Sequence, residues 1–346
     1  MKLISNLFKW TCISFGSLLV LLLLAGATTR LLSPAPQAPG ELIDVGGYHL
    51  HLHRTGEQNE LPTLVIEAGA GAPGEYYHWL SEGLKEHLRV VRYDRAGIGY
   101  SEFPDSPRDP ETAVQELHQL LEAAGEKPPY LMAGHSYGGH YIRMFAQRYP
   151  EEVAGLVFLD ASHPETGKRM GLPSTSWFMD PMYKLGVVVG DIGLLHLYDH
   201  TLGPILWAPG LPEEVVNQVK AYTYDGDFIR GYLKGDGNDT YSRQLRAGAA
   251  AADDFGDLPI RVFSGTHQND KALLRLGVDP EHFRSERIQM QKELAALSTD
   301  SELYFLDAGH VTIFTLPEHA EVICEEVLEM VAGHTSNEPS SHLAKR

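Results

Sequence analysis

The stretch that decides the fold is Gly134-His135-Ser136-Tyr137-Gly138-Gly139, between the apolar run 130–133 and a helical stretch at 141–149. A nucleophile at a tight strand-to-helix turn needs small residues two positions before and two after it, because neighbouring backbones otherwise collide. Glycines stand at both positions. The following helix would aim its N-terminal amides at a developing oxyanion. Ser136 is therefore the predicted nucleophile; the alternative is an incidental serine in a glycine-rich turn.

A serine needs a base within hydrogen-bond reach, because its hydroxyl is a poor nucleophile near neutral pH. The usual chain order after such a turn is Ser, then Asp or Glu, then His. Among 17 histidines, His310 follows directly on the last apolar run, 304–306, in Asp307-Ala308-Gly309-His310. A loop just past a strand end is where the base must lie, so we predict that His310 is the base. A surface-loop imidazole is the alternative.

From residue 41 onward, short β-rich runs alternate with helical ones, which indicates a mostly parallel sheet covered on both faces. The pieces 42–45 and 48–53 flank Gly46-Gly47 and predict an antiparallel hairpin. The long connection 160–258 is too long for a structureless loop, so a helical cap is expected there. Further buried strands are predicted at 63–66, 89–93, 130–133, 154–159, 259–263 and 303–306, with helices after Pro110 and Pro317.

With these motifs in place, the chain resembles the α/β-hydrolase superfamily from residue 41 to about 332. Tyr93-Asp94-Arg95-Ala96-Gly97-Ile98-Gly99-Tyr100-Ser101 resembles the family's turn after its fourth strand, and Ile66-Glu67-Ala68-Gly69-Ala70-Gly71 resembles its oxyanion loop. The resemblance implies the backbone N–H groups of Ala70 and Tyr137 as oxyanion donors. Many members have His-Gly where this chain has Ala68-Gly69. We expect Asp94 and Arg95 to be structural residues that hold their turn.

The expected fold is therefore α/β, with a mostly parallel central sheet flanked by helices and a helical cap inserted after the sixth strand. The expected division is an N-terminal anchor or signal peptide with linker (1–40), a hydrolase core (41–160 and 256–332), a helical cap (161–255) and a polar tail (333–346).

Two aspartates compete for the acid that orients the imidazole. In many family members the acid follows the seventh strand, where this chain has Ser264-Gly265-Thr266-His267-Gln268-Asn269-Asp270 and the expected position is not acidic. Asp160 ends the sixth predicted strand, and some relatives place their acid there. A strand end is a more rigid mount than a loop tip, so Asp160 is favoured and Asp270 is kept as the alternative.

The chemistry expected from these residues is acyl transfer by a serine hydrolase of the carboxylesterase type. A serine at the turn argues against relatives such as epoxide hydrolases and haloalkane dehalogenases, whose aspartate forms an alkyl ester. Apolar cap residues suggest that the substrate is a small or medium hydrophobic ester or amide: Trp177, Phe178, Met182 and Tyr183. The alternatives are an aminopeptidase, for which Asp191, Glu213 and Glu214 could hold a free amine, a lactonase, or a ligand-binding protein without turnover.

No cofactor is expected, because this mechanism needs only water. His49, His51 and His53 alternate along one strand, but the outer two would lie about 13 Å apart, too far for one metal ion. We therefore expect no metal site and interpret these residues as an exposed hairpin face.

The net charge and the N-terminal leader limit the partners and the cellular compartment that we expect. The 28 basic and 46 acidic residues give a net charge of −18, which argues against nucleic-acid binding.

Residues 10–29 carry no charge and would span roughly 30 Å as a helix, enough to cross a bilayer. Lys2 and Lys9 should stay in the cytoplasm, so the hydrolase part would face outside. Either an uncleaved membrane anchor or a signal peptide cleaved after Ala27 fits, the latter giving a secreted or periplasmic chain. A buried core helix is disfavoured by the proline-rich linker 33–40. The oligomeric state is not predicted.

Overall fold

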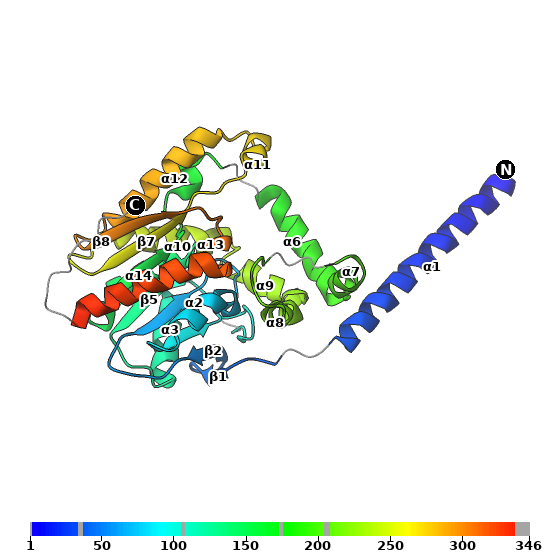
Figure 1. The fold of residues 1–346 in the computed structure, drawn as a ribbon. Coiled ribbons are helices and arrows are strands. Elements are labelled where there is room, and N and C mark those ends of the chain that lie inside the picture. The colour runs from blue at the N-terminus through cyan, green and yellow to red at the C-terminus, as the bar shows by residue number, and fades with distance from the viewer. Residues whose placement is uncertain (1, 34–36, 105–107, 173–175, 204–207, 336–346) are drawn as a thin grey trace.

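The computed structural model describes residues 2–33, 37–104, 108–172, 176–203 and 208–335 (Figure 1). Eight strands form one sheet in the order β1-β2-β4-β3-β5-β6-β7-β8. β2 runs antiparallel to β1 and β4, and the pairs from β4 through β3 to β8 are parallel. The strands are β1 (Glu41–Asp44), β2 (His49–Thr55), β3 (Thr63–Glu67), β4 (Val90–Tyr93), β5 (Tyr130–His135), β6 (Val153–Leu159), β7 (Ile260–Gly265) and β8 (Ser301–Leu306). The predicted fold class is confirmed, and each predicted strand is present with ends shifted by at most a few residues.

Both faces of the sheet are buried, because side chains alternate between two hydrophobic clusters along the central strands. Val65 and Met132 join one cluster, whereas Leu64, Ile66 and Leu131 join the other. The first cluster lies under α3 (Pro110–Ala123), α4 (Gly138–Arg148), α10 (Asp239–Ala251) and the end of α12 (Pro280–Ala295). The second lies under α2 (His78–Leu84), α13 (Thr312–Thr315) and α14 (Pro317–Thr335).

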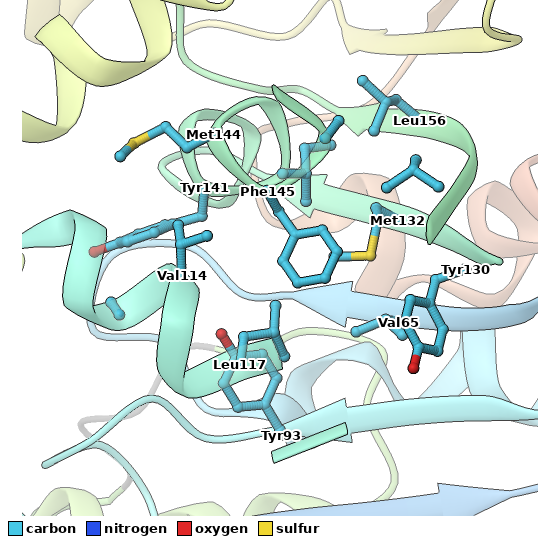
Figure 2. Packing of buried hydrophobic residues seen from close by; sticks show 14 of the residues in the cluster. Val65, Tyr93, Val114, Leu117, Tyr130, Met132, Tyr141, Met144, Phe145 and Leu156 are labelled. Carbon is cyan, nitrogen blue, oxygen red and sulfur yellow. The ribbon is translucent and has the colours of Figure 1, made fainter. Parts of the chain in front are cut away.

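Figure 2 shows the first cluster, in which Phe145 of α4 lies beside Met132 of β5 and faces Leu117 of α3. The two helices begin in different ways. Asp109 caps α3 by accepting a hydrogen bond from the Thr112 amide at 2.7 Å, and Pro110 stands at its first position. The start of α4 has no such side-chain cap. Its N-terminal end lies directly after Ser136, where free amides can stabilise a negative charge.

The segment between β6 and β7 is helical, as expected. It contains α5 (Thr166–Arg169), α6 (Ser176–Asp191), α7 (Leu194–Leu202), α8 (Glu213–Thr223), α9 (Gly226–Lys234) and α10. Tyr241 and Leu245 of α10 belong to the core cluster with α3 and α4, so this last helix packs on the body of the molecule. The short helices η1 (Gly74–Tyr77), η2 (Pro150–Glu152) and α11 (Asp270–Arg275) complete the described elements.

The leader forms the helix α1 (Lys2–Leu32), which projects away from the body and meets it only at its C-terminal end (Figure 1). Within its segment Ile4–Leu32, a window of 18 residues has a mean hydropathy of 2.0, which is sufficient by length and composition for a membrane anchor or a signal peptide.

The three alternating histidines of β2 do not form an exposed hairpin face. His51 is fully buried, and its Nδ1 donates to Asp94 at 2.8 Å. His49 contacts Glu102, and His53 contacts Glu75. The prediction was wrong because β2 lies inside the sheet, between β1 and β4, and η1 and the turn after β4 cover it. Among the described residues, no group of three or more His, Cys, Asp or Glu side chains is placed to hold a metal ion.

Candidate active site

Ser136 occupies the sharp turn between β5 and α4 in a strained backbone conformation, with φ of 51°. Positive φ is uncommon for a residue with a side chain, and it persists only where the surroundings enforce it. The flanking glycines explain how the turn closes. A Cβ on Gly134 would lie 2.7 Å from the Gly138 carbonyl carbon, and a Cβ on Gly138 would collide with the Glu67 carbonyl oxygen. Larger residues at these positions would therefore open the turn.

His310 and Asp160 come together from loops that follow two different strands. The His310 Nδ1 donates to Asp160 Oδ2 at 2.7 Å. Asp160 follows β6 and is itself strained, with φ of 42°. Its Oδ1 also accepts from the Ser264 hydroxyl at 3.2 Å and from the Gly265 amide at 3.1 Å. These bonds fix the carboxylate, which in turn fixes the imidazole.

Asp270, the alternative acid, lies elsewhere. It begins α11 at the surface and accepts a hydrogen bond from Gln268 at 2.7 Å. Arg284 lies 3.6 Å from its other oxygen. Within the described residues, Asp270 makes no contact with His310.

Arg287 of α12 is a partner of Asp160 that the sequence did not reveal. Its Nη2 lies 2.8 Å from both carboxylate oxygens, and its Nη1 donates to the His267 carbonyl at 3.2 Å. Burial raises the pKa of Asp160, but the hydrogen bond from His310 and the positive charge of Arg287 outweigh burial and leave that pKa below its ordinary value. The carboxylate is therefore ionised at neutral pH.

The hydroxyl of Ser136 faces the same pocket as His310 and Asp160. Its Oγ lies 3.5 Å from the Ser162 Oγ, and in the described part of the chain no hydrogen bond joins it to His310. Rotation about χ1 changes where this hydroxyl points, and such contacts often tighten only when substrate binds.

His135, the residue before Ser136, connects the loops around the site. Its Nε2 donates to the His310 carbonyl at 3.0 Å, and its Nδ1 accepts from the Tyr77 hydroxyl at 2.9 Å. That hydroxyl accepts in turn from the Gly69 amide at 3.0 Å. Burial lowers the pKa of His135 well below its ordinary value, so the ring is neutral. The bridging role of His135 could not be predicted from the sequence, because a buried bridging imidazole looks like any other residue in a motif.

The amides of Ala70 and Tyr137 are free. In the described part of the chain neither N–H donates a hydrogen bond, whereas the neighbouring amides of Gly69 and Gly71 are held by Tyr77 and Asp236. Two unengaged amides, one from the loop after β3 and one at the start of α4, are what an oxyanion requires.

Arg95 fixes the loop that carries Ala70. Its guanidinium donates to the Ala68 carbonyl at 2.7 Å and to the Gly69 carbonyl at 2.6 Å. It is also paired with Glu67 of β3 and with Asp236, which follows α9, the latter at 2.6 Å. This buried network joins the cap to the loop after β3. Asp94 accepts from the amides of Gly74 and Tyr100 and so holds its own turn.

A pocket of about 410 Å³ opens beside Ser136, and we refer to it as the Ser136 pocket. Its lining includes five large apolar side chains: Met170, Leu172, Leu273, Phe283 and Met290. Two of the predicted substrate-binding residues lie elsewhere. Met182 is 60% exposed, and the Tyr183 ring packs against Tyr232 with centroids 5.2 Å apart. The side chains of the other two, Trp177 and Phe178, lie outside the described residues.

The Ser136 pocket is lined by elements for which the sequence predicted no binding role. They are the connection after β6 and helices α11 and α12. Helical spacing alone does not tell a pocket wall from a packed core, so the sequence held no signal for these residues.

Comparison with known proteins agrees with this architecture. Residues 62–191 match a family model described as "alpha/beta hydrolase fold". A crystal structure of DBJA matches with a TM-score of 0.60 at 19% identity, covering 87% of this chain and 100% of that one. The enol-lactonase from Burkholderia xenovorans LB400 matches with a TM-score of 0.57 at 20% identity, covering 84% and 100%. At these identities the likeness establishes the fold.

Curated relatives match over shorter stretches. The "Uncharacterized protein YbdG" of Bacillus subtilis (strain 168) is 29% identical over 126 residues, which is 36% of this chain and 39% of that protein. The chain matches less than half of the length of each of the first five curated relatives. These relatives therefore assign neither an activity nor a substrate to this chain.

Proposed function

We propose that this chain, which is a member of the α/β-hydrolase superfamily, is a serine hydrolase that cleaves an ester bond of a small to medium hydrophobic substrate. One observation carries the proposal: a strained serine faces the same pocket as an imidazole bonded to a buried, ionised carboxylate. The roles are nucleophile for Ser136, base for His310 and acid for Asp160.

In the proposed reaction, the Ser136 Oγ attacks the ester carbonyl carbon and its proton passes to the His310 Nε2. The amides of Ala70 and Tyr137 stabilise the tetrahedral oxyanion. The bond to the leaving alcohol breaks as the imidazolium returns the proton to the alcohol oxygen. Water then attacks the acyl-enzyme with His310 again as base, which releases the acid and restores the serine. Asp160 stabilises the imidazolium in both steps.

The residue at the turn separates this reaction from that of aspartate-dependent members of the superfamily. Acyl transfer through a serine gives an acyl ester that water hydrolyses at the carbonyl carbon. An aspartate would be needed to displace a group from an alkyl carbon. The serine at position 136 therefore favours ester cleavage.

Aminopeptidase activity is less well supported. A free amine would need an unpaired carboxylate near Ser136, but the one carboxylate that lines this pocket among the described residues is Asp160, which is paired. Asp191 pairs with Arg230, and Glu213 and Glu214 line a different groove. Parallel assays on ester, lactone and aminoacyl-amide substrates would rank these activities.

Replacement of the nucleophile tests the proposal. Ser136→Ala should reduce turnover of p-nitrophenyl esters by roughly 10⁴ to 10⁶. Ser162→Ala is the matched control, because it removes a hydroxyl 3.5 Å away in the same pocket and should leave turnover within about tenfold of the parent. A fluorophosphonate should label the parent and the control but not Ser136→Ala. Near-parental turnover by Ser136→Ala would refute the assignment, and an unlabelled, inactive parent would indicate a ligand-binding protein.

We also propose that the leader is retained as a membrane anchor, which the packing of α1 supports. Gly26 and Gly193 approach so closely that a Cβ on Gly26 would lie 2.5 Å from the Ile192 carbonyl oxygen. Cleavage after Ala27 would discard this contact. Mass spectrometry of the mature chain should find residues 1–27 present, and a chain that begins after Ala27 would refute retention.

A further inference from the structure

The end of the anchor helix α1 is fixed to the cap by specific contacts. Arg30 donates to the Asp191 carbonyl at 2.6 Å and pairs with Asp225 at 2.9 Å. Ser33 lies 3.3 Å from the Nδ1 of His196. The cap helices α6 and α7 therefore lie directly at the end of a helix that is long enough to cross a bilayer (Figure 1).

One face of α6 packs on the protein and the opposite face does not. The packed face contains Tyr183 against Tyr232, Gly186 beside Ile229, and Gly190, whose Cβ would lie 2.8 Å from the Gly226 amide. These residues recur at helical spacing on the side toward α9. A surface helix in water would carry polar residues on its other side.

That other side carries large apolar residues beside one exposed lysine, Lys184. Met182, Leu185 and Val188 of α6 are 60%, 62% and 53% exposed. Tyr198 and Leu202, four residues apart on α7, are 47% and 73% exposed. We refer to these five residues as the apolar cap face. A cluster of large exposed apolar side chains on one side of a molecule marks an interaction surface.

The occupant that fits this face is a lipid bilayer. The face belongs to the same two helices that meet the end of α1, so a membrane spanned by α1 would lie against it. Interfacial helices bury their apolar side into the boundary between headgroups and acyl chains, and the outer side of α6 has that composition. A docked protein would have to share this position with the bilayer itself.

The Ser136 pocket has an exposed apolar residue close in the chain to α6. Leu172, which lines the pocket, is 38% exposed and precedes α6 by a few residues. Beyond it the pocket wall continues with Met170, Leu273 and Phe283. These side chains form an apolar wall that suits an acyl chain bound beside Ser136.

We propose that the apolar cap face lies in the membrane interface, and that the Ser136 pocket takes its substrate, a long-chain acyl ester, from the bilayer. The proposal rests on the serine hydrolase function given above, and it extends the substrate class from small or medium hydrophobic esters to long-chain acyl esters. It also places the cap at the membrane surface, a position that does not follow from the catalytic residues.

The functional test uses the full chain reconstituted in phosphatidylcholine vesicles. The double variant Leu185→Gln/Val188→Asn should hydrolyse 4-methylumbelliferyl palmitate held in the vesicles about tenfold more slowly than the parent, since two aliphatic side chains lose their favourable burial. Its rate on water-soluble p-nitrophenyl acetate should stay within about twofold, because neither residue lines the pocket. The control Leu42→Gln alters a side chain that is 51% exposed on β1, at the edge of the sheet, and should leave both rates unchanged.

Equal rates of the double variant and the parent on the vesicle ester would overturn the proposal, as would a parallel loss on both substrates. Failure of the serine hydrolase function would look different, since the parent would then hydrolyse neither ester and would resist fluorophosphonate labelling.

A structural measurement tests the position of the face directly. Nitroxide labels at Leu185→Cys and Leu42→Cys, in a Cys12→Ser background where the remaining Cys324 is buried, report contact with lipid. The label at 185 should be more accessible to oxygen than to a water-soluble nickel complex, and the label at 42 should show the reverse. Equal behaviour at both positions would overturn the proposal. Dipolar coupling between labels at 185 would assign the face to a second copy of the chain and would also overturn it.

Discussion

Replacement of Asp160 by asparagine removes one charge from the centre of the proposed site. The carboxylate accepts from Ser264, Gly265, Arg287 and His310 at 2.7 to 3.2 Å. An asparagine offers one oxygen and one NH₂ group in the same space. If the NH₂ group faces His310, two donors oppose each other unless the imidazole gives up its Nδ1 proton. The ring would then carry its proton on Nε2, the atom that must accept the proton of Ser136.

The other orientation of the asparagine is no better. Its NH₂ group would oppose the Gly265 amide, and Arg287, whose side chain is only 12% exposed, would lose its negative partner in either orientation. Loss of the correct tautomer at a serine hydrolase triad costs about 10⁴ in kcat. This factor corresponds to about 5.5 kcal/mol of transition-state stabilisation. We expect Asp160→Asn to lose activity to that extent.

Steady-state kinetics on a soluble p-nitrophenyl ester measure the effect, with Asp270→Asn as the control. Asp270 is exposed and contacts Gln268 and Arg284 rather than His310, so its variant should retain activity within about twofold. Thermal unfolding of both variants checks that they remain folded. A folded Asp160→Asn with more than about a tenth of parental kcat, or a larger loss in Asp270→Asn, would refute the assignment of the acid.

Two further predictions concern buried groups. Burial and the nearby charge of Arg143 lower the pKa of His140 from 6.5 to about 3. Between pH 6.5 and pH 3, the unfolded chain therefore binds a proton at His140 that the folded chain does not bind. Stability should therefore fall as pH falls from about 6.5 toward 3, and from pH 8 to pH 5 the parent should lose about 2 kcal/mol more than His140→Phe. Chemical denaturation in detergent at both pH values measures this, and equal pH dependence in the two proteins would contradict it. Asp236→Ala breaks the buried pair with Arg95 and should cost about 3 to 5 kcal/mol. Asp227→Ala, whose pair with Arg230 is largely exposed, should cost less than about 1 kcal/mol in the same assay, and similar costs for both would argue against the buried network.

Much of the fold could be predicted from the sequence because its signals are local. Alternating and continuous apolar runs gave the positions of the strands, and Gly46-Gly47 predicted the turn between β1 and β2. The glycines around Ser136 predicted a tight strand-to-helix turn, and the strained φ of Ser136 agrees with it. In each case the physical cause, a side-chain period or a steric limit, acts within a few residues of the chain.

The burial of His51 was missed because it depends on neighbours far away in the sequence. Its partner Asp94 lies 43 positions later. A strand with polar residues on one face looks exposed when it is considered alone. Only the pairing of β2 with β4 brings the turn after β4 over that face, where Asp94 gives the imidazole a carboxylate.

In the candidate site, too, some features follow from the local sequence and others from contacts between distant residues. The sequence by itself determined which residue types were available, their order along the chain, and the turn that presents Ser136. Only the tertiary structure decided that Asp160 rather than Asp270 meets His310, that Arg287 shares this carboxylate, and that His135 bridges two loops. It also decided that helices α11 and α12, rather than Met182 and Tyr183, line the pocket. The contacts of Asp160 with His310 and Arg287, and of His135 with His310, join residues more than a hundred positions apart. Their distances depend on how β6, β7 and β8 lie side by side and on how the cap folds over them.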